Sequence, residues 1–210
     1  MGKAMSLANL LKKTYNCFEF SAPWKEAFGS PQKTGVWFIW GHSGNGKTAL
    51  TMQLCMELSR HGRLAYNSRE EGGDKTLQDA FIRAGFESFT GPNKPIILDE
   101  PMSELSERLL KRRSPDFVVI DSFQYAGLSY AEYKRYKELH RNKLLIFISH
   151  ADGKNPMGRA ATSVMYDASL KIWVEGMRAT SKGRYIGSNG GFYDIWPEES
   201  AKYHGQSNSI

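Results

Sequence analysis

The chain has 210 residues, enough for one domain with a substantial core of its own. Hydrophobic residues make up 40% and charged residues 24%, a composition that excludes wholesale disorder. The formal net charge of +6 favours a polyanionic partner such as nucleic acid, although a solvated basic surface would account for it equally well. No apolar run approaches the roughly 18–20 residues of a membrane span, and the amino-terminal one is too short for a secretory signal, so we expect a cytoplasmic protein that does not engage a membrane.

Strand and helix patterns alternate along most of the chain. A short amphipathic helix is expected within residues 4–13, and a turn-rich stretch then leads to residue 34. The apolar runs at residues 35–40, 64–66, 95–98, 116–121 and 143–149 have strand length, and helical patterns occupy residues 47–60, 76–84, 103–113 and 130–140. This alternation predicts an α/β fold with a mainly parallel sheet. From residue 168 onward, glycines separate strand-like segments, which predicts antiparallel hairpins at the C-terminal side.

One segment carries a specific phosphate-binding signal. Gly41 to Thr48 matches G-x-x-x-x-G-K-[ST] and lies between a predicted strand and a predicted helix, as this loop requires. Its glycines allow backbone N–H groups to face phosphates at the positive end of the helix dipole. Lys47 would reach the β- and γ-phosphates of ATP, and the Thr48 hydroxyl would bind Mg²⁺. The residues expected to hold the nucleotide are Gly41, His42, Ser43, Gly44, Asn45, Gly46, Lys47 and Thr48.

Acidic residues follow two other predicted strands. Asp121 ends the run at residues 117–120, and we expect it on a strand beside the phosphate loop, where it would hold a metal-bound water. Glu70 and Glu71 follow the strand at residues 64–66, which we expect next to the phosphate-loop strand. A carboxylate there could activate the water that attacks the γ-phosphate. Two solvated glutamates at the mouth of a loop would give the same pattern.

These pieces, in this order, resemble the RecA-like branch of P-loop ATPases, nearest its RadA-type and DnaB-type members, over residues 35–195. Residues 64–71 are similar to the strand that ends in the family's catalytic glutamate, which favours Glu70 over Glu71. Residues 119–124 resemble its Walker B segment, in which Asp121 is followed by a glutamine, Gln124, which the resemblance makes a candidate nucleotide-binding residue. Residues 147–150 resemble the strand whose polar end senses the γ-phosphate, so His150 is a candidate sensor; a histidine at the core edge is the alternative.

The resemblance implies a three-layer RecA-like core over residues 35–196. A helix and lead-in would precede it at residues 1–34, and a tail would follow at residues 197–210. Arg178, Lys182 and Arg184 resemble the basic hairpin that reaches the neighbouring subunit's nucleotide in ring-forming members, which makes Lys182 and Arg184 candidate catalytic residues supplied in trans. Strand alternation would also point these two side chains to the same face. A basic edge strand that discourages aggregation is the alternative.

Residues 151–161 form a candidate loop after the sensor strand. In RecA-like rings this loop faces the central channel, and here Lys154 and Arg159 would bind a nucleic-acid backbone without reading its sequence. The family's loop pattern is only loosely present, and a charged surface loop would look the same. The basic cluster at residues 111–113 is better explained as a complement to a helix dipole than as a binding patch.

Three functions compete. The resemblance implies a Mg²⁺-dependent ATPase that assembles into a homo-oligomeric ring or filament and acts on DNA, favouring single strands, in recombination, repair or replication. A KaiC-like regulatory or partner-loading ATPase switch without DNA contact is the alternative. A small-molecule P-loop kinase is disfavoured, because no Arg-rich lid follows the sensor strand. The positive net charge tilts the balance toward the first.

Overall fold

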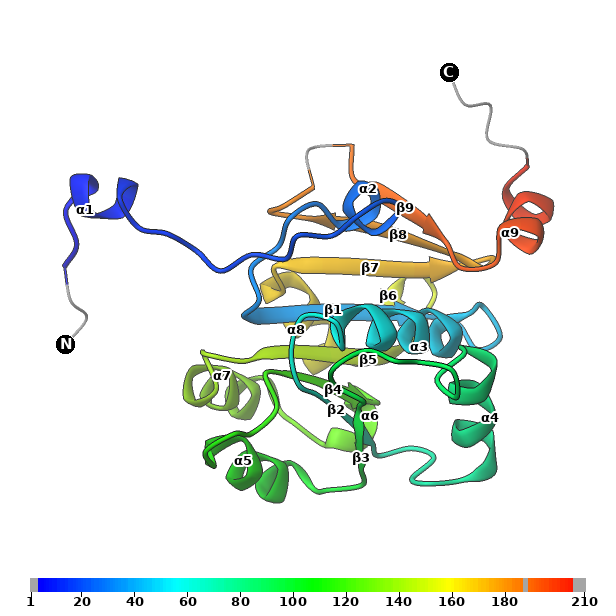
Figure 1. Ribbon diagram of the computed structural model, residues 1–210, viewed down its shortest axis with the longest axis horizontal. Helices are drawn as coiled ribbons and strands as arrows, with labels where there is room; N and C mark the ends of the chain where they lie inside the picture. The colour runs from blue at the N-terminus through cyan, green and yellow to red at the C-terminus, as the bar shows by residue number, and fades with distance from the viewer. Residues whose placement is uncertain (1–3, 187–188, 206–210) are drawn as a thin grey trace.

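The computed structural model describes residues 4–186 and 189–205 and is built around one twisted sheet (Figure 1). The strands lie in the order β3-β2-β4-β5-β1-β7-β8-β9, and β6 pairs with the end of β5. The first five in this order are parallel with β7, whereas β8 and β9 continue the sheet as antiparallel strands. Their bounds are β1 Gly35–Gly41, β2 Leu64–Ser68, β3 Ile96–Leu98, β4 Phe117–Asp121, β5 Leu144–Asp152, β6 Asn155–Pro156, β7 Leu170–Glu175, β8 Arg178–Gly183 and β9 Gly191–Asp194.

Helices cover both faces of the sheet and give it three layers. Because side chains alternate along a strand, Trp37 and Ile39 of β1 enter one core, whereas Val36 and Phe38 enter the other. The first core includes residues of α2, α3 and α4, and the second includes residues of α5, α6, α7 and α8. The helices are α1 Leu7–Leu11, α2 Trp24–Phe28, α3 Lys47–Leu58, α4 Lys75–Arg83, α5 Met102–Leu110, α6 Phe123–Ala126, α7 Tyr130–Leu139, α8 Arg159–Asp167 and α9 Pro197–His204.

The central strands are buried on both faces, which explains their continuous apolar runs. Phe117 to Ile120 of β4 and Leu144 to Ile148 of β5 are at most 2% exposed. Strands covered by helices on both faces have no polar side, so they lose the alternation that marks a half-exposed strand. The α/β fold predicted from the sequence, with its mainly parallel sheet and its C-terminal antiparallel strands, is confirmed.

The order of the strands corrects one expectation. β5 lies between β1 and β4, so the strand that ends in Asp121 does not pair with β1, although Asp121 lines a cavity together with the phosphate loop. β2 pairs with β4 and β3, so the strand that precedes Glu70 is not a neighbour of β1 either. Strand order depends on contacts between distant segments, which a local apolar pattern does not contain. The carboxyl ends of all these parallel strands nevertheless meet at one edge of the sheet.

Two predicted segments also have more structure than expected. β5 continues to Asp152 and pairs with β6, and α8 begins at Arg159, so residues 151–161 form a strand end, a short hairpin and a helix start instead of one long loop. Within the segment predicted as a C-terminal tail, residues 197–204 form α9. The structure of residues 206–210 lies outside the described part of the chain.

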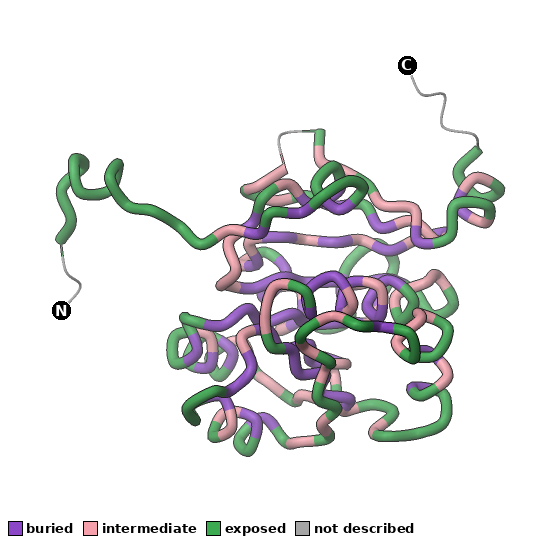
Figure 2. The backbone as a smooth tube through the Cα atoms, in the orientation of Figure 1, coloured by how far each residue is buried: buried purple, intermediate pink, exposed green. Residues whose placement is uncertain are grey.

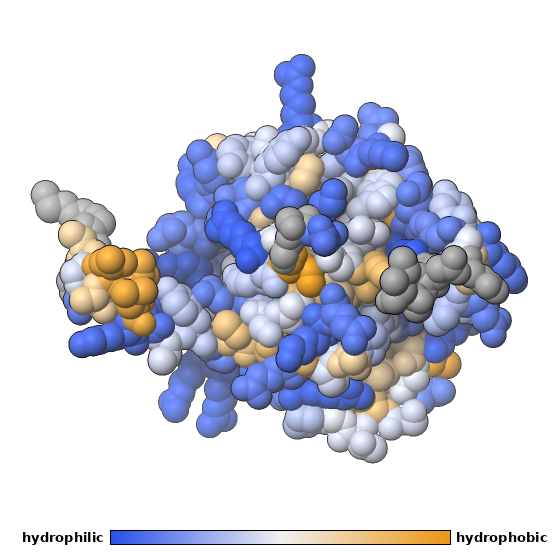
Figure 3. All heavy atoms as spheres, turned by 90° about the horizontal axis from the view of Figure 1, so that it is seen from above, coloured by the Kyte–Doolittle hydropathy of each residue, from blue (hydrophilic) through white to orange (hydrophobic). Residues whose placement is uncertain are grey.

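The amino-terminal segment projects away from the sheet (Figure 2). Leu7 and Leu11 of α1 are 69% and 77% exposed, and α1 has no buried residue. Figure 3 shows the resulting apolar patch at the end of this arm. Within the described residues, no helix has the length and apolar character needed to cross a membrane.

Candidate nucleotide-binding site

The residues predicted to bind a nucleotide converge at the carboxyl edge of the parallel strands. A cavity of about 340 Å³ opens between the loop that follows β1 and the ends of β2, β4 and β5. It contains groups suited to phosphate, metal and water. The lining residues are Ser43, Gly44, Gly46, Lys47, Thr48, Ala49, Glu70, Glu71, Arg83, Asp121, Ser122, Ile148, Ser149, His150 and Met177.

The phosphate-loop backbone is shaped to receive an anion. Gly44 and Gly46 have φ values of +77° and +101°, a region that side chains with a Cβ rarely adopt. In the described part of the chain, no backbone N–H of residues 43–46 donates a hydrogen bond to a protein acceptor. The first N–H groups of α3 have no partner within the helix either. These donors fit the phosphates of a nucleotide, in the manner predicted from the motif.

The loop is tied to the turn between β7 and β8. The Asn45 side chain accepts a hydrogen bond from the Gly176 N–H at 2.8 Å, and the Asn45 carbonyl accepts one from the Met177 N–H at 3.2 Å. A Cβ on Gly46 would come within 2.8 Å of the Met177 sulfur. Asn45 therefore anchors the phosphate loop to this turn, and its side chain does not line the cavity.

Lys47 is partly buried and points back along its own loop. Its Nζ donates to the His42 carbonyl at 2.9 Å. Burial lowers the pKa of the Lys47 ammonium group, while the carboxylates of Asp121 and Glu70 act in the opposite direction. A phosphate in the cavity would offer this ammonium group a stronger acceptor than a neutral carbonyl. His42 itself is exposed, and its ring edge lies against Trp173 with 5.9 Å between the centroids.

Asp121 lies at the end of β4, and its carboxylate accepts a hydrogen bond from the Tyr66 hydroxyl. Burial raises the pKa of the Asp121 carboxyl, the Tyr66 hydrogen bond opposes this, and the charges of Glu70 and Glu71 add to it. This crowding of negative charge suits a site that is completed by a cation. Thr48 and Asp121 both line the cavity, and one hydroxyl with one carboxylate matches the few protein ligands that Mg²⁺ takes beside nucleotide phosphates. The described residues contain no larger cluster of metal-binding side chains.

The two glutamates after β2 have different partners. The Glu70 carboxylate lies 3.1 Å from Nε2 of His150, and the backbone N–H of Glu70 donates to the Asp121 carbonyl at 3.2 Å. The Glu71 carboxylate instead accepts a hydrogen bond from the Thr76 hydroxyl at 2.8 Å, at the start of α4. Glu70 is thus directed toward the ends of β4 and β5. This difference supports the choice of Glu70 as the candidate base.

Gln124 is near the cavity but does not line it. Its Nε2 donates to the Ser149 hydroxyl at 2.8 Å and to the Met157 carbonyl at 3.0 Å, and its Oε1 accepts from the His150 N–H at 3.3 Å. The side chain therefore joins α6 to the end of β5 and to the hairpin beyond it. In this arrangement Gln124 positions His150, and a direct contact with the nucleotide stays a prediction.

Lys182 and Arg184 are far from the phosphate loop of their own chain. β8 runs antiparallel to β7, so Lys182 pairs with Lys171 and the Arg184 N–H donates to the Ser169 carbonyl at the amino edge of the sheet. Arg184 follows the end of β8, so the strand alternation expected to align it with Lys182 does not reach it. Arg178, at the other end of β8, binds Asp194 at 2.6 Å.

Lys154 and Arg159 are both exposed at the carboxyl edge of the sheet. Lys154 lies in the turn between β5 and β6, where its carbonyl accepts a hydrogen bond from the Trp40 indole at 3.0 Å. Arg159 is the first residue of α8. Neither side chain forms a salt bridge with another described residue, so both are accessible to a partner.

The structure adds one cavity residue, and one buried residue behind the cavity, that the sequence patterns did not indicate. Arg83, the last residue of α4, lines the cavity and carries no salt bridge to the described residues. Tyr66 is 1% exposed, and its hydroxyl binds Asp121 from within β2. The positions of both side chains depend on how α4 and β2 pack against the ends of α3 and β4, so no local sequence motif predicts them.

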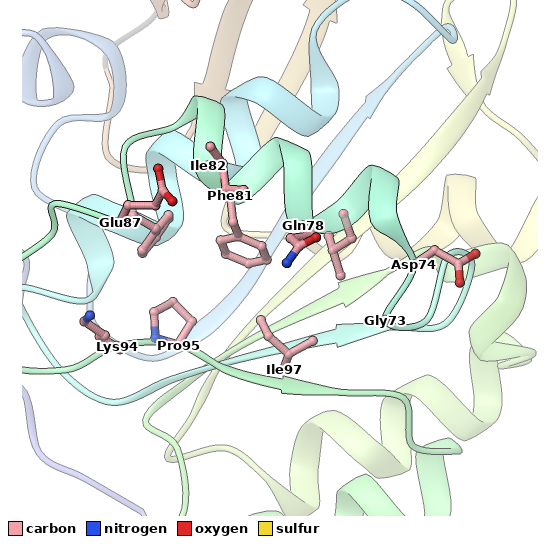
Figure 4. A pocket seen from close by; sticks show the side chains of 11 residues that line it. Gly73, Asp74, Gln78, Phe81, Ile82, Glu87, Lys94, Pro95 and Ile97 are labelled. Atoms are coloured by element: carbon pink, nitrogen blue, oxygen red, sulfur yellow. The ribbon is translucent and has the colours of Figure 1, made fainter.

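A second cleft lies on the other side of α4, against the edge strand β3 (Figure 4). Its volume is about 470 Å³, and Phe81, Ile82 and Ile97 contribute apolar walls. Asp74 and Glu87 also line it, so it lacks the concentration of donors found around the phosphate loop. The cavity beside α3 is therefore the candidate nucleotide site.

The sheet order, with β5 between the phosphate-loop strand and the Asp121 strand, defines the fold together with the C-terminal antiparallel strands as that of a RecA-like P-loop NTPase. Among solved structures, the chain resembles the flagellar accessory protein FlaH from Methanocaldococcus jannaschii, with a TM-score of 0.54 and 15% sequence identity. The match covers 82% of this chain and 92% of that chain. No protein-family model matches the sequence, and the comparison with curated proteins found no match. The likeness to FlaH therefore concerns the fold.

Proposed function

We propose that the protein is a Mg²⁺-dependent ATPase that works as an oligomeric switch, using ATP binding and hydrolysis to control its association with a partner. The observation that carries the proposal is the approach of Glu70 to His150 at 3.1 Å, at the mouth of a cavity that also holds Lys47 and Asp121. The cavity thus combines a phosphate-binding lysine, a metal-binding carboxylate and a base with its orienting group. Structural likeness to a flagellar accessory protein agrees with a role beside a partner.

The chain's own residues supply the steps of hydrolysis. Lys47 and the N–H groups of the phosphate loop bind the phosphates. Thr48 and Asp121 would hold Mg²⁺, and the ion would neutralise charge on the phosphates. Glu70 accepts a proton from the attacking water, and His150 fixes the direction of that carboxylate. In this arrangement the γ-phosphate would lie against His150, so the Glu70–His150 contact would respond to its loss.

The proposal includes assembly because, among the described residues, none that follows Met177 in sequence lines the cavity. Lys182 and Arg184 are exposed at the amino edge of the sheet, where their own nucleotide is out of reach. In a ring or filament, these two side chains would reach the γ-phosphate of the nucleotide bound to a neighbouring copy. An arginine supplied in this way is worth about 10³–10⁵ in hydrolysis rate.

Action on single-stranded DNA is a second candidate. The observation that favours it is the exposure of Lys154 and Arg159 on the carboxyl edge, beside the strand that carries His150. A strand bound there would be coupled to the γ-phosphate through β5. Recombination, repair and replication would all use such coupling.

The test measures phosphate release from ATP with Mg²⁺, with EDTA and with added single-stranded DNA, alongside the particle mass with and without ATP. We expect Mg²⁺-dependent turnover and an ATP-dependent increase in mass. Lys47→Ala should abolish turnover without changing the circular dichroism spectrum. Turnover that rises with DNA would favour the second candidate, and a wild-type protein that neither binds nor hydrolyses ATP would contradict both.

A further inference from the structure

Basic side chains gather at the amino edge of the sheet, opposite the nucleotide cavity. A cavity of about 460 Å³ opens there among the end of α5, the turn between α7 and β5, and the segment before β2. Helices α5 and α7 lie at the left of Figure 1. Its lining residues include no carboxylate and no aromatic ring. They are Arg63, Leu109, Leu110, Lys111, Arg113, Ser114, Leu139, Arg141, Asn142 and Lys143.

Two of these cations are fixed in place by the protein. Lys143 is 7% exposed, and its Nζ donates to the Ser114 hydroxyl at 2.9 Å. The Ser114 hydroxyl donates in turn to the Leu109 carbonyl at 2.8 Å. Arg63 is held by Asp116, which accepts from its backbone N–H at 3.0 Å and from its guanidinium group at 3.3 Å. The floor of the cavity is therefore a built arrangement of donors.

Lys111 and Arg113 also line the cavity, and both are exposed. Neither side chain makes a hydrogen bond or a salt bridge within the described part of the chain. The positive charge of Lys111 helps to lower the pKa of the Glu100 carboxyl without direct contact. Arg113 has a φ of +62°, which is uncommon for a residue with a Cβ. A complement to the dipole of α5 would explain Lys111 alone. It does not explain why Arg63, Arg141 and Lys143 converge on the same cavity from other segments.

The basic surface continues past this cavity. A second hollow of about 190 Å³ shares Arg141 and Lys143 with the first and adds Lys137 and Arg184. Carboxylates reappear here, because Asp167 pairs with Lys137 at 2.6 Å, and Glu138 lies 3.5 Å from Arg141. Two adjoining hollows with shared cationic walls suit successive phosphates better than one isolated anion.

We propose that the amino-edge cavity binds the phosphate backbone of a nucleic-acid strand. The side-chain donors that line it belong to the arginines, the lysines and the Asn142 amide, and they match phosphate oxygens. No aromatic ring lines this cavity, so bases are not stacked inside it and its contacts with phosphate are independent of sequence. A planar lipid surface would touch the rim of such a concavity but would not enter it. The site is separate from the ATP cavity and from Lys154 and Arg159.

The experiment measures fluorescence anisotropy of a fluorescein-labelled oligodeoxythymidine with the full chain. The variant Lys111→Glu/Arg113→Glu should raise the Kd at least about tenfold. It should also reduce the slope of log Kd against log salt by about 1.4, because each lost phosphate contact on a single strand contributes about 0.7. Lys12→Glu/Lys13→Glu is the matched control, with the same charge change at two exposed positions of the amino-terminal arm, and it should bind like the wild type. ATP binding should be equal in all three proteins.

Several results would overturn the proposal. They are a wild-type protein that does not bind the oligonucleotide, a Lys111/Arg113 variant that binds it as tightly as the wild type does, and a Lys12/Lys13 control that loses as much affinity as the Lys111/Arg113 variant. Equal competition by polyglutamate at matched charge would exclude recognition of phosphate. Binding to phosphatidylglycerol vesicles without binding to the oligonucleotide would assign the surface to lipid. If the doubly reversed variant does not fold, Lys111→Gln/Arg113→Gln gives the same comparison with half the charge change.

Discussion

Glu70 and His150 are 80 positions apart in the chain, yet Oε2 of one lies 3.1 Å from Nε2 of the other. Glu70 lies just after the carboxyl end of β2, and His150 lies within β5, near its carboxyl end. β4 lies between these two strands. Both side chains are about one third exposed, so water reaches the contact. The pair therefore links the candidate base to the strand that would sense the γ-phosphate.

Glu70→Gln should leave ATP affinity unchanged while lowering turnover by at least about 10²-fold, because the amide keeps the size of the carboxylate but cannot accept the proton of water. Glu71→Gln is the matched control. Its carboxylate binds Thr76, so its loss should leave most of the activity. Phosphate release and the affinity for a fluorescent ATP analogue would be measured for both. If Glu71→Gln were the inactive variant, the assignment of the base would be wrong by one residue.

Arg83→Ala should raise the Kd for ATP about tenfold, since a guanidinium on the cavity wall can form charge-assisted hydrogen bonds with a phosphate. Arg83→Lys should recover part of the loss. Arg112→Ala removes an exposed arginine outside the cavity and should have no effect. Titration of a fluorescent ATP analogue measures the three affinities, and equal values for Arg83→Ala and the wild type would remove Arg83 from the site.

Much of this site could be predicted from local sequence. The phosphate loop is recognisable because its glycines, lysine and threonine are fixed by one short backbone shape. The apolar runs of β4 and β5 are recognisable because both faces are buried. The position of β5 between β1 and β4 was missed, since it depends on pairing between segments more than a hundred residues apart, such as Gly35 with Leu144. Arg83 was missed because a helix end enters a cavity only through the orientation of the whole helix.

Asp167→Ala should lower the free energy of unfolding by about 1–3 kcal/mol at pH 7. Its carboxylate accepts hydrogen bonds from the Tyr133 hydroxyl at 2.5 Å and from Lys137 at 2.6 Å, joining α7 to α8. Removing it leaves the fully buried Tyr133 hydroxyl without this acceptor. Lys137 is partly exposed, so its ion pair adds little. Asp79→Ala, which breaks a surface pair with Lys75, should change stability by less than about 0.5 kcal/mol.

The Asp167 effect should depend on pH. Burial alone would raise the pKa of the Asp167 carboxyl, but the hydrogen bonds from Lys137 and Tyr133 outweigh it, so the pKa lies below its ordinary value. A carboxyl with a lowered pKa stabilises the fold above its unfolded pKa of about 3.9, and this contribution is lost as the pH falls through the folded pKa. Urea unfolding of both proteins at several pH values should therefore show a difference that is full at pH 7 and shrinks below about pH 4. A constant difference would contradict the ion-paired role of Asp167.

Arg184 tests whether neighbouring copies share a site. Its N–H binds Ser169 at the amino edge of the sheet, so its side chain serves no nucleotide in its own chain. If Arg184 acts in trans, the Arg184→Ala variant should bind ATP normally but hydrolyse it at least about 10³-fold more slowly.

Mixing the Arg184→Ala variant with Glu70→Gln should restore part of the activity, because some interfaces would combine an intact Glu70 with an intact Arg184 from the neighbour. Glu70→Gln mixed with Lys47→Ala is the control, since no interface then has a complete site. The measurement is ATP turnover across mixing ratios at fixed total protein, with co-assembly confirmed by mass. Activity that stays near zero at every ratio would leave Arg184 as an exposed basic residue after β8, which lies between β7 and β9 and is therefore not the basic edge strand that the sequence offered as the alternative.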